Sequence, residues 1–380
     1  MSGVRLAIDA LAMDGKKVGI EKYVYNLITT LSTFALDMEI DIHIQEHMRE
    51  NFESKGNINC KFHRDFKGDR ERLMYELFNM PHLYRKEKYD IVHFMDCLSP
   101  LVPIGAKRVY TLYDLAYLRN RRPFTLKKGI TKGILFDIAT RSADGILCAS
   151  QSLKEDLIQQ YKFLDEDKVY VTYLAAEQIK DVPVRGAEAD WILQQYGIDD
   201  RFILYVGPID SSKNIAVLLK AYGEIKANTS LPHRLVLCGE MGEPYDHITE
   251  VIGEYGALKE DIVYIHNISD EILPLLYSRA DVFVYPSLYE RFDIYPMEAM
   301  LYETPIISSN IPYLSEVIGD AGLYFHPYDH VELGLLLVGI LSDEALRGEL
   351  KNRGKQQVAK FSWGDTAKKT LSAYRNIAQA

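Results

Sequence analysis

The segment Asp281–Asn310 reads DVFVYPSLYERFDIYPMEAMLYETPIISSN and predicts a strand, a loop, a helix and a second strand, in that order. The run Val282–Tyr285 is short, β-branched and aromatic, and Pro286 ends it, which is typical of a buried parallel strand. Pro296 occupies what would be a first helical position, and Ile306 opens the next strand. This order indicates a βαβ-type unit of an α/β domain.

Two carboxylates, Glu290 and Glu298, lie eight residues apart in this segment. In an unbroken helix they would lie about 12 Å apart along the axis, at about 1.5 Å per residue. Pro296 disfavours helical geometry at the residue before it, so we expect Glu290 in the loop and Glu298 in the first helical turn. Both would then lie at the carboxyl end of a strand, where open α/β sheets bind ligands and where a helix start favours phosphate. The plainer interpretation is that Glu298 complements the helix dipole and Glu290 is a solvated loop residue.

Strand-like and helix-like patterns alternate on both sides of a candidate linker, Lys180–Asp190, which contains Pro and Gly and little apolar periodicity. Such alternation predicts parallel sheets and therefore two doubly wound domains with a cleft between them. Coenzyme dehydrogenases share that outline, but the turn Ala10–Gly15 after the first strand has no G-x-G-x-x-G. The predicted strands are Val4–Asp9, Ile40–Gln45, Ile58–His63, Ile91–Met95, Arg108–Leu112, Gly145–Cys148, Val169–Tyr173, Phe202–Val206, Arg234–Cys238, Ile262–Ile265 and Asp281–Tyr285. The predicted helices are Glu21–Phe34, Arg70–Lys86, Ser150 or Ser152 to Tyr161, Ile215–Ile225, His247–Tyr255, Asp270–Ser278, Val331–Leu341, Asp343–Gly354 and Thr366–Ile377.

Composition predicts a globular, cytoplasmic protein. The 380 residues are comfortable for two domains, with 47% hydrophobic and 26% charged residues. No run of 18 or more apolar residues predicts a membrane span, and the N-terminus lacks a signal-peptide cleavage pattern. The four cysteines are isolated and form no C-x-x-C pair, which predicts that most of them are buried thiols in a reducing compartment; they are Cys60, Cys97, Cys148 and Cys238.

Charge is unevenly distributed along the chain. The formal net charge is −10; residues 1–180 contain 27 basic and 25 acidic residues, whereas the remaining 200 contain 17 and 29. An acidic chain argues against nucleic acid as a partner. The segment Lys107–Arg141 is locally basic and includes Tyr117 and Phe124. It is either a solvated helix face or a peripheral contact with anionic lipid at the inner face of a membrane or with a phosphorylated acceptor.

The segment Glu290–Glu298 resembles the E-x7-E signature of retaining GT-B glycosyltransferases of the family-4, group 1 type, whose usual form is E-G-F-G-x-x-P-x-E-A-M. Further motifs extend the resemblance over nearly the whole chain, in the family's order and spacing. They are Gly19–Val24 (G-x-G-R-Y-V), Thr111–Leu115 (T-x-H-D-L), Tyr205–Gly207 with Lys213 and Asn214 (Y-V-G-x-x-x-P-R-K-N), Thr304–Ile307 (T-P-V-V), Ser315–Ala321 (P-E-V-x-G-D-A) and Phe361–Trp363 (F-S-W).

The resemblance implies the GT-B fold, an α/β architecture of two doubly wound Rossmann-like parallel-sheet domains facing a cleft. It implies an acceptor-side domain at residues 1–182, a nucleotide-sugar-binding domain at 183–362 and a terminal helix at 363–380 that crosses back to the first domain. The implied activity is transfer of a hexose from a UDP- or GDP-linked sugar, with retention and with neither cofactor nor metal. The acceptor would be a glycan, a lipid-linked glycan or a protein, as in the biosynthesis of cell-surface polysaccharide.

The resemblance also assigns residues to roles. Lys213 matches the family lysine on the diphosphate, Glu298 would hold the ribose hydroxyls, and Glu290 would hold hydroxyls of the transferred sugar. Gly19 would let the backbone approach phosphate closely. The implied catalytic residues are Glu290, Lys213, Tyr113 and Asp114, and the implied donor-binding residues are Gly19, Glu298, Lys213, Arg291, Ile294 and Ser287.

Several positions depart from the family pattern. Glu21 replaces a glycine, and a carboxylate about 5 Å from a phosphate would cost roughly 3 kcal/mol at an effective dielectric near 20. Ser212 replaces an arginine, and Tyr113 replaces a histidine, although a phenol can still donate. Arg291 and Asp293 replace both glycines of the loop; Arg291 would restore the lost cation, and Asp293 would cap the following helix.

These departures keep two alternatives open beside an active transferase. One is a catalytically impaired GT-B relative that acts as partner or scaffold of another glycosyltransferase. The other is a GT-B enzyme of different chemistry, such as a nucleotide-sugar epimerase or a phosphorylase.

Overall fold

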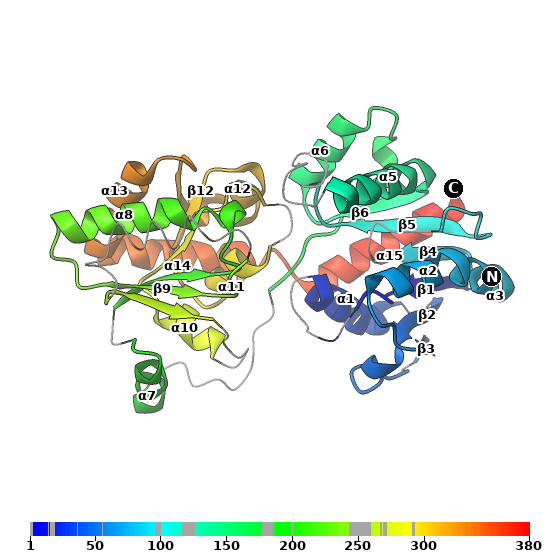
Figure 1. Ribbon diagram of the computed structural model, residues 1–380, viewed down its shortest axis with the longest axis horizontal. Coiled ribbons are helices and arrows are strands. Elements are labelled where there is room, and N and C mark those ends of the chain that lie inside the picture. The colour runs from blue at the N-terminus through cyan, green and yellow to red at the C-terminus, as the bar shows by residue number, and fades with distance from the viewer. Residues whose placement is uncertain are drawn as a thin grey trace. The chain divides into compact units, whose positions relative to one another are not determined.

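The computed structural model describes residues 3–13, 15, 20–35, 37–54, 56–95, 100–115, 126–176, 186–198, 201–242, 260–266, 268, 272–290 and 293–380; for residues 126–132 it describes only the backbone. The chain divides into two compact units. Unit 1 comprises Met1–Leu174 and Ser362–Ala380, and unit 2 comprises Ala175–Phe361. The sequence-based domain limits, at 182 and 362, lie near these divisions. Each unit is a parallel sheet with helices on both of its faces (Figure 1).

The described strands of unit 1 form a seven-stranded parallel sheet in the order β3-β2-β1-β4-β5-β6-β7. Consecutive strands are added outward on one side from β1 and then on the other side from β4, so the strand order reverses between β1 and β4. The strands are β1 (Val4–Asp9), β2 (Met38–Gln45), β3 (Ile58–His63), β4 (Ile91–Phe94), β5 (Lys107–Leu112), β6 (Gly145–Cys148) and β7 (Val169–Val171). The helices are α1 (Ile20–Phe34), α2 (Asp69–Phe78), α3 (Met80–Glu87), α5 (Leu126–Ser142), α6 (Gln151–Gln160) and α15 (Trp363–Gln379), with 3-10 turns η1 (Glu46–Met48) and η2 (Glu166–Lys168).

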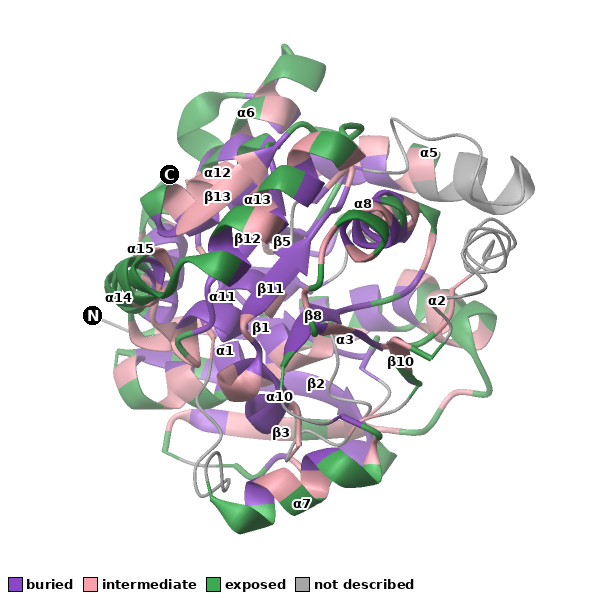
Figure 2. Ribbon diagram, turned by 90° about the vertical axis from the view of Figure 1, so that its left-hand side faces the viewer, coloured by how far each residue is buried: buried purple, intermediate pink, exposed green. Residues whose placement is uncertain are grey.

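Strand β4 shows how the sheet separates two buried layers. Val92 and Phe94 join an apolar cluster that includes Tyr84 of α3 and Phe136 of α5. Side chains alternate along a strand, and the intervening His93 is hydrogen-bonded to the C-terminal helix α15 through its Nδ1 atom (2.6 Å to the Tyr374 hydroxyl). Figure 2 shows that the central strands are buried, whereas exposed residues lie mainly on the helices.

The C-terminal helix α15 belongs to unit 1 although it follows unit 2 in the sequence. The Ser362 hydroxyl caps it by accepting from the Asp365 N–H (3.0 Å). Trp363 contacts Tyr23 of α1, with ring centroids 5.7 Å apart. Gly145 of β6 leaves room for Ile377, because a Cβ there would lie 2.2 Å from the Ile377 Cδ1 atom.

The described strands of unit 2 form a six-stranded parallel sheet in the order β10-β9-β8-β11-β12-β13, which reverses between β8 and β11. The strands are β8 (Phe202–Val206), β9 (Arg234–Cys238), β10 (Ile262–Ile265), β11 (Val282–Tyr285), β12 (Ile306–Ser309) and β13 (Gly322–Phe325). The helices are α7 (Ala187–Gln195), α8 (Ile215–Asn228), α10 (Leu273–Arg279), α11 (Tyr295–Leu301), α12 (Pro312–Ile318), α13 (His330–Ser342) and α14 (Glu344–Val358), with 3-10 turns η3 (Ser211–Lys213) and η5 (Gly319–Ala321).

Two glycines bring the loops after β8 and β9 into direct contact. Gly207 and Gly239 have φ angles of 142° and 148°, a region that favours glycine. A Cβ at Gly239 would lie 1.9 Å from the Gly207 carbonyl oxygen. The Gly207 N–H donates to the Cys238 carbonyl (2.9 Å), which places the β8 loop over the end of β9. The backbone conformation of Gly207 therefore explains why the Y-V-G motif has a glycine at this position.

The structure confirms every predicted strand, and most predicted helices, to within a few residues. The prediction of one continuous helix over Arg70–Lys86 is wrong. The helix is interrupted at Asn79, which separates α2 from α3, and Pro81 lies in the first turn of α3. The predicted C-terminal limit of the linker Lys180–Asp190 is wrong, because helix α7 already begins at Ala187, with acidic residues in its first turn. Helix α12 and strand β13 are additional elements.

Some predictions fall outside the described residues. They include the helix His247–Tyr255, Cys97, and most basic side chains of Lys107–Arg141. Cys148 and Cys238 are buried free thiols as predicted, whereas Cys60 is only half-buried. None of the described helices combines the length and apolar character needed to cross a bilayer.

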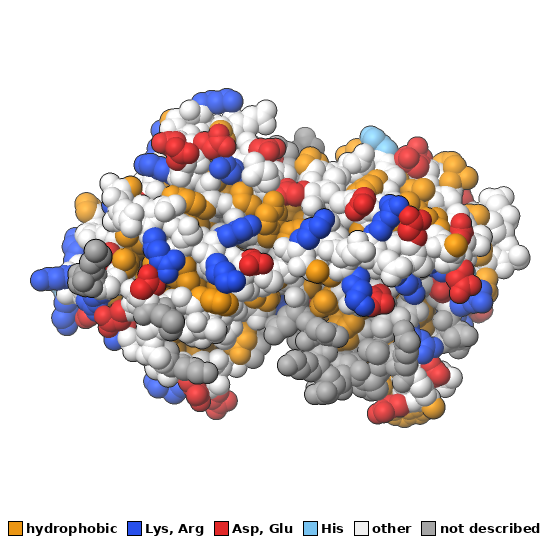
Figure 3. Space-filling view, turned by 180° about the vertical axis from the view of Figure 1, so that it is seen from behind, with side chains coloured by type: hydrophobic (Ala, Val, Ile, Leu, Met, Phe, Trp, Pro, Cys, Tyr) orange, Lys and Arg blue, Asp and Glu red, His pale blue; other side chains and the backbone are white. Residues whose placement is uncertain are grey.

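Charged side chains of both signs intermingle on the molecular face shown in Figure 3. Exposed ion pairs within helices follow the same pattern, such as Arg353–Glu349 on α14 and Arg141–Asp137 on α5. Exposed pairs of this kind contribute little to stability, typically about 0.3–0.5 kcal/mol each.

Candidate functional site

The strand order of unit 2 marks a candidate ligand site at the carboxyl ends of β8 and β11. Open α/β sheets bind ligands where the strand order reverses, because the loops after the two central strands diverge there. Lys213 follows β8, and Glu290 and Asp293 follow β11. These strands are parallel neighbours, with Val282 opposite Ile203, so both loops leave from the same edge of the sheet.

Local hydrogen bonds explain how Lys213 reaches this edge. The Asp210 carboxylate accepts from the Ser212 N–H (2.8 Å) and the Lys213 N–H (3.3 Å), which closes the 3-10 turn η3. Asn214 then adopts a left-handed conformation with φ of 55°, and its side-chain amide donates to the Pro286 carbonyl (3.1 Å). The Leu288 N–H also donates to the Ser212 carbonyl (3.0 Å). The β8 and β11 loops are therefore tied together, and Lys213 points between them.

A buried cluster of three charged side chains and one phenol occupies the switch point. Lys213 Nζ lies 2.5 Å from Glu290 Oε1 and 2.8 Å from Asp293 Oδ2. It also donates to the Tyr285 hydroxyl (3.2 Å), and that hydroxyl donates to Asp293 Oδ2. Exposure is 9% for Lys213, 6% for Glu290 and 9% for Asp293, so these charges have little water around them. The prediction that Glu290 is a solvated loop residue is therefore wrong.

The electrostatics of the cluster follow from two carboxylates sharing one ammonium. Burial raises the pKa of Glu290 to about 7; the Lys213 ammonium opposes this rise, and the Asp293 carboxylate adds to it. Burial would lower the pKa of Lys213, but Asp293 and Glu290 outweigh burial and raise it above its ordinary value. Lys213 is therefore a cation at neutral pH, and Glu290 exchanges a proton near neutrality.

Tyrosines surround the cluster. The rings of Tyr205 and Tyr285 are stacked, with centroids 6.1 Å apart, and the Tyr205 hydroxyl donates to the Pro208 carbonyl (2.6 Å). The Tyr313 hydroxyl holds the backbone of Asp293, accepting from its N–H (3.0 Å) and donating to its carbonyl (2.7 Å). Asp293 is consequently held through its main chain as well as its carboxylate.

The other predicted site residues of unit 2 lie along the same loop and helix. Glu298 is 4% exposed in the first turn of α11, and its Oε2 atom accepts from the Tyr277 hydroxyl (3.2 Å). Ser287 is fully buried. Ile294 is the residue before α11, and its carbonyl accepts from the Glu298 N–H (2.9 Å). Gly19 and Arg291 lie outside the described residues.

The predicted residues of unit 1 are placed separately. Tyr113 is buried after β5, and its ring meets Tyr23 edge-on at 5.8 Å. Asp114, beside it, is exposed. Glu21 is half-buried in the first turn of α1.

The sequence interpretation missed two members of the cluster, Asp293 and Tyr285. The prediction that Asp293 caps the following helix is wrong, because no side chain caps α11 and the Asp293 carboxylate binds Lys213 instead. A carboxylate three residues after Glu290 in a loop facing a family lysine was the available signal. Tyr285 was assigned only to a strand, although a phenol at the last position of a buried strand reaches the ligand-binding edge.

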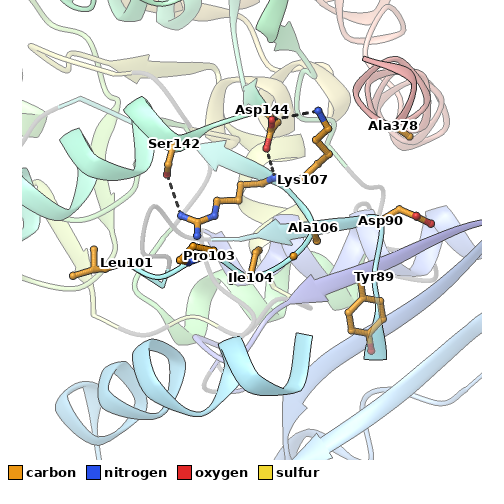
Figure 4. Close-up of a pocket in the computed structure, with 12 residues that line it drawn as sticks. Tyr89, Asp90, Leu101, Pro103, Ile104, Ala106, Lys107, Ser142, Asp144 and Ala378 are labelled. Atoms are coloured by element: carbon orange, nitrogen blue, oxygen red, sulfur yellow. Dashed lines mark hydrogen bonds and ion pairs between the residues drawn. The ribbon is translucent and has the colours of Figure 1, made fainter. Parts of the chain in front are cut away.

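Unit 1 has a hollow of about 700 Å³ at the edge of its sheet where strands begin (Figure 4). Lys107 and Asp144 sit at the amino ends of β5 and β6, away from the carboxyl ends where such sheets bind ligands. Its polar groups are bonded within the protein: Lys107 Nζ is 3.7 Å from Asp144, Asp144 accepts from the backbone N–H of Arg108 (2.8 Å), and the Arg108 guanidinium donates to the Val102 carbonyl. The way the first residues of β5 and β6 pack therefore accounts for this hollow.

Two Rossmann-like units, the second with a lysine–carboxylate cluster at its switch point, define the GT-B class of glycosyltransferase fold. Residues 192–357 match the family model described as glycosyl transferases group 1, and residues 18–175 match glycosyltransferase family 4. The chain belongs to this family of group 1, family-4 type glycosyltransferases.

Similar proteins include the O-antigen chain mannosyltransferase B of Escherichia coli, 34% identical over 62% of this chain and 61% of that protein. The serotype-specific mannosyltransferase WbdA of Escherichia coli is 28% identical over 72% of this chain. The chain spans 61% of the length of the first relative and 34% of the second. Among solved structures, the sucrose-phosphate synthase of Thermosynechococcus elongatus superposes with a TM-score of 0.73 at 21% identity, covering 98% of this chain and 99% of that one.

Proposed function

We propose that this chain is a retaining glycosyltransferase that moves a hexose from a UDP- or GDP-linked donor to a glycan, a lipid-linked glycan or a protein, without a metal ion. The observation that carries the proposal is the meeting of Lys213 and Glu290 at the switch point of unit 2. Transfer from a nucleotide sugar requires stabilisation of a leaving diphosphate, which a fixed cation supplies. A carboxylate beside that cation accepts sugar hydroxyls.

Mannose is the first sugar to test. Two relatives of this chain are named O-antigen chain mannosyltransferase B and serotype-specific mannosyltransferase WbdA. A mannose-containing glycan is accordingly the first acceptor to test. The names of these relatives support transfer, and they give no support to the scaffold, epimerase or phosphorylase alternatives.

The test is transfer by the full chain. The protein is incubated with GDP-mannose or UDP-glucose and a short mannoside acceptor, with and without EDTA, and the product is identified by mass spectrometry. NMR of the product should show the anomeric configuration of the donor. Glu290→Ala removes the carboxyl group that would hold the sugar hydroxyls, so we expect transfer to fall by at least a hundredfold, about 2.7 kcal/mol of transition-state stabilisation. No binding of either nucleotide sugar and no transfer would favour the scaffold alternative; an inverted product would contradict retention.

A further inference from the structure

The ammonium of Lys213 has no free donor in this cluster. An ammonium carries three N–H donors and no acceptor. Three oxygen partners meet them: Glu290 Oε1 at 2.5 Å, Asp293 Oδ2 at 2.8 Å and the Tyr285 hydroxyl at 3.2 Å. A diphosphate can therefore bind Lys213 only by displacing one of these partners.

The charges of the cluster also oppose an incoming anion. One ammonium and two carboxylates give a formal charge of −1, and all three side chains are about nine-tenths buried. Low solvent access strengthens both the attraction within the cluster and the repulsion of a further anion. A ligand that pulls Lys213 away leaves the Glu290 and Asp293 carboxylates near each other, with the Tyr285 hydroxyl within hydrogen-bond reach of both.

We propose that Asp293 makes donor binding proton-coupled: the donor diphosphate takes Lys213 from Asp293 and Glu290, and the carboxylate pair left behind takes up one proton from solvent. Lys213 keeps its own proton and no covalent bond changes. The inference rests on the proposed function, because it requires a diphosphate ligand at this site. Asp293 is a positioning residue in this account, since it acts on the donor through Lys213.

The direction of proton movement follows from the groups that face the cluster. Two carboxylates this close cannot both remain ionised in a buried site without a cation. Glu290 already has a pKa of about 7 with Lys213 in place, and losing Lys213 raises that pKa further. The other described groups near the cluster are the Glu316 carboxylate of α12 and four tyrosines. Burial raises the pKa of each tyrosine, so all four stay neutral near pH 7: Tyr205 (β8), Tyr285 (β11), Tyr295 (α11) and Tyr313 (α12).

Uptake of one proton makes donor affinity depend on pH. Affinity should fall by about tenfold per pH unit above pH 7, where Glu290 is ionised in the free protein, and should level off below about pH 6, where it already carries the proton. A nucleotide sugar is the suitable probe, because its pyrophosphate lacks the terminal phosphate group that titrates near pH 6.

The experiment is calorimetric titration of the full chain with GDP-mannose and with UDP-glucose at pH 6, 7 and 8. At pH 8, two buffers of different ionisation enthalpy count the protons taken up. We expect nearly one proton for the unmodified protein. Asp293→Asn removes one charge and keeps the backbone bonds to Tyr313, so we expect about tenfold tighter binding at pH 8 and clearly less proton uptake. Glu303→Gln removes an exposed charge elsewhere in unit 2, where Glu303 pairs with Lys355 (3.0 Å), and should change neither quantity.

Donor binding without proton uptake, or an Asp293→Asn variant with unchanged affinity and uptake, would overturn the inference and leave the proposed function standing. Absence of nucleotide-sugar binding at every pH would overturn both. Circular dichroism checks the fold of the variant; should Asp293→Asn not fold, the buffer series on the unmodified protein decides alone.

Discussion

A buried ammonium is stable only when charged or polar groups replace the water it has lost. Lys213 shows what this requires of a sequence: its partners Glu290 and Asp293 lie 77 and 80 residues away, in the loop after another strand. The family resemblance predicted a role for Glu290 and Lys213, and the structure brings the two together. Asp293 could not be assigned in the same way, because an aspartate before a helix is typical of a cap, and only the folded chain shows that a lysine competes for its carboxylate.

At the residue scale, Glu298 gives a prediction for donor binding. Its carboxylate is buried at the start of α11 and has the Tyr277 hydroxyl as a donor (3.2 Å). If it accepts ribose hydroxyls, Glu298→Ala should weaken nucleotide-sugar binding by about 1.5–3 kcal/mol, the range for hydrogen bonds to a charged group. Titration calorimetry measures this difference. Tyr277→Phe is the matched control, because it removes the neighbouring donor and leaves the carboxylate; equal affinities for the alanine variant and the unmodified protein would remove Glu298 from the donor site.

At the element scale, apolar runs were sufficient to predict the strands, because strands buried on both faces read as continuous hydrophobic segments. The four residues of β11, for example, are all buried. The runs are less informative at β13 (Gly322–Phe325), whose apolar part, Leu323–Phe325, is only three residues long. They also fail where helical periodicity continues across a break, as at Asn79, because the two short helices α2 and α3 keep similar apolar spacing.

The contact between β6 and α15 gives a prediction for stability. Gly145→Ala would place a methyl group 2.2 Å from Ile377 Cδ1 and 3.0 Å from its Cγ1 atom, so α15 or the side chain must shift. We expect unfolding free energy to fall by about 1–3 kcal/mol, the usual effect of overpacking a core. Urea denaturation followed by circular dichroism measures it.

Two further variants separate a clash from a general effect of alanine. Gly133→Ala lies within helix α5 of the same unit, where a Cβ meets no described atom within 4 Å, and should be neutral or stabilising by up to about 1 kcal/mol. Adding Ile377→Ala to Gly145→Ala should relieve the clash, so the two changes should be less than additive. Similar stabilities for Gly145→Ala and Gly133→Ala would show that α15 is not packed tightly on β6.

At the scale of the whole molecule, the two units hold buried titratable groups of opposite kinds. In unit 1, burial lowers the pKa of His43 and of His93 to about 3, so both are neutral in the folded protein. In unit 2, burial raises the pKa of Glu290 to about 7. Acidification from neutral pH therefore changes the stability of the two units in opposite directions. It protonates the unfolded histidines first and destabilises unit 1, whereas folded Glu290 takes up its proton before unfolded glutamate does, which favours unit 2.

Unit 1 should consequently lose stability as the pH falls through 6.5, the ordinary pKa of histidine in an unfolded chain. Above that pH neither state binds the protons and the histidines have no effect; below it, only the unfolded state binds them, down to the folded pKa near 3. Each buried histidine should then account for about 1.4 kcal/mol between pH 7.5 and 5.5, or about 3 kcal/mol together.

The chain has two tryptophans, and in a Trp191→Phe background the fluorescence of Trp363, which contacts Tyr23, reports on unit 1 during urea unfolding. His93→Gln should be less stable at every pH, because His93 bonds Tyr374 and Thr111, yet its loss between these two pH values should be about half as large. An unfolding midpoint that stays constant over this range, or a His93→Gln variant with the full pH dependence, would mean that water reaches these histidines and lets them titrate in the folded state.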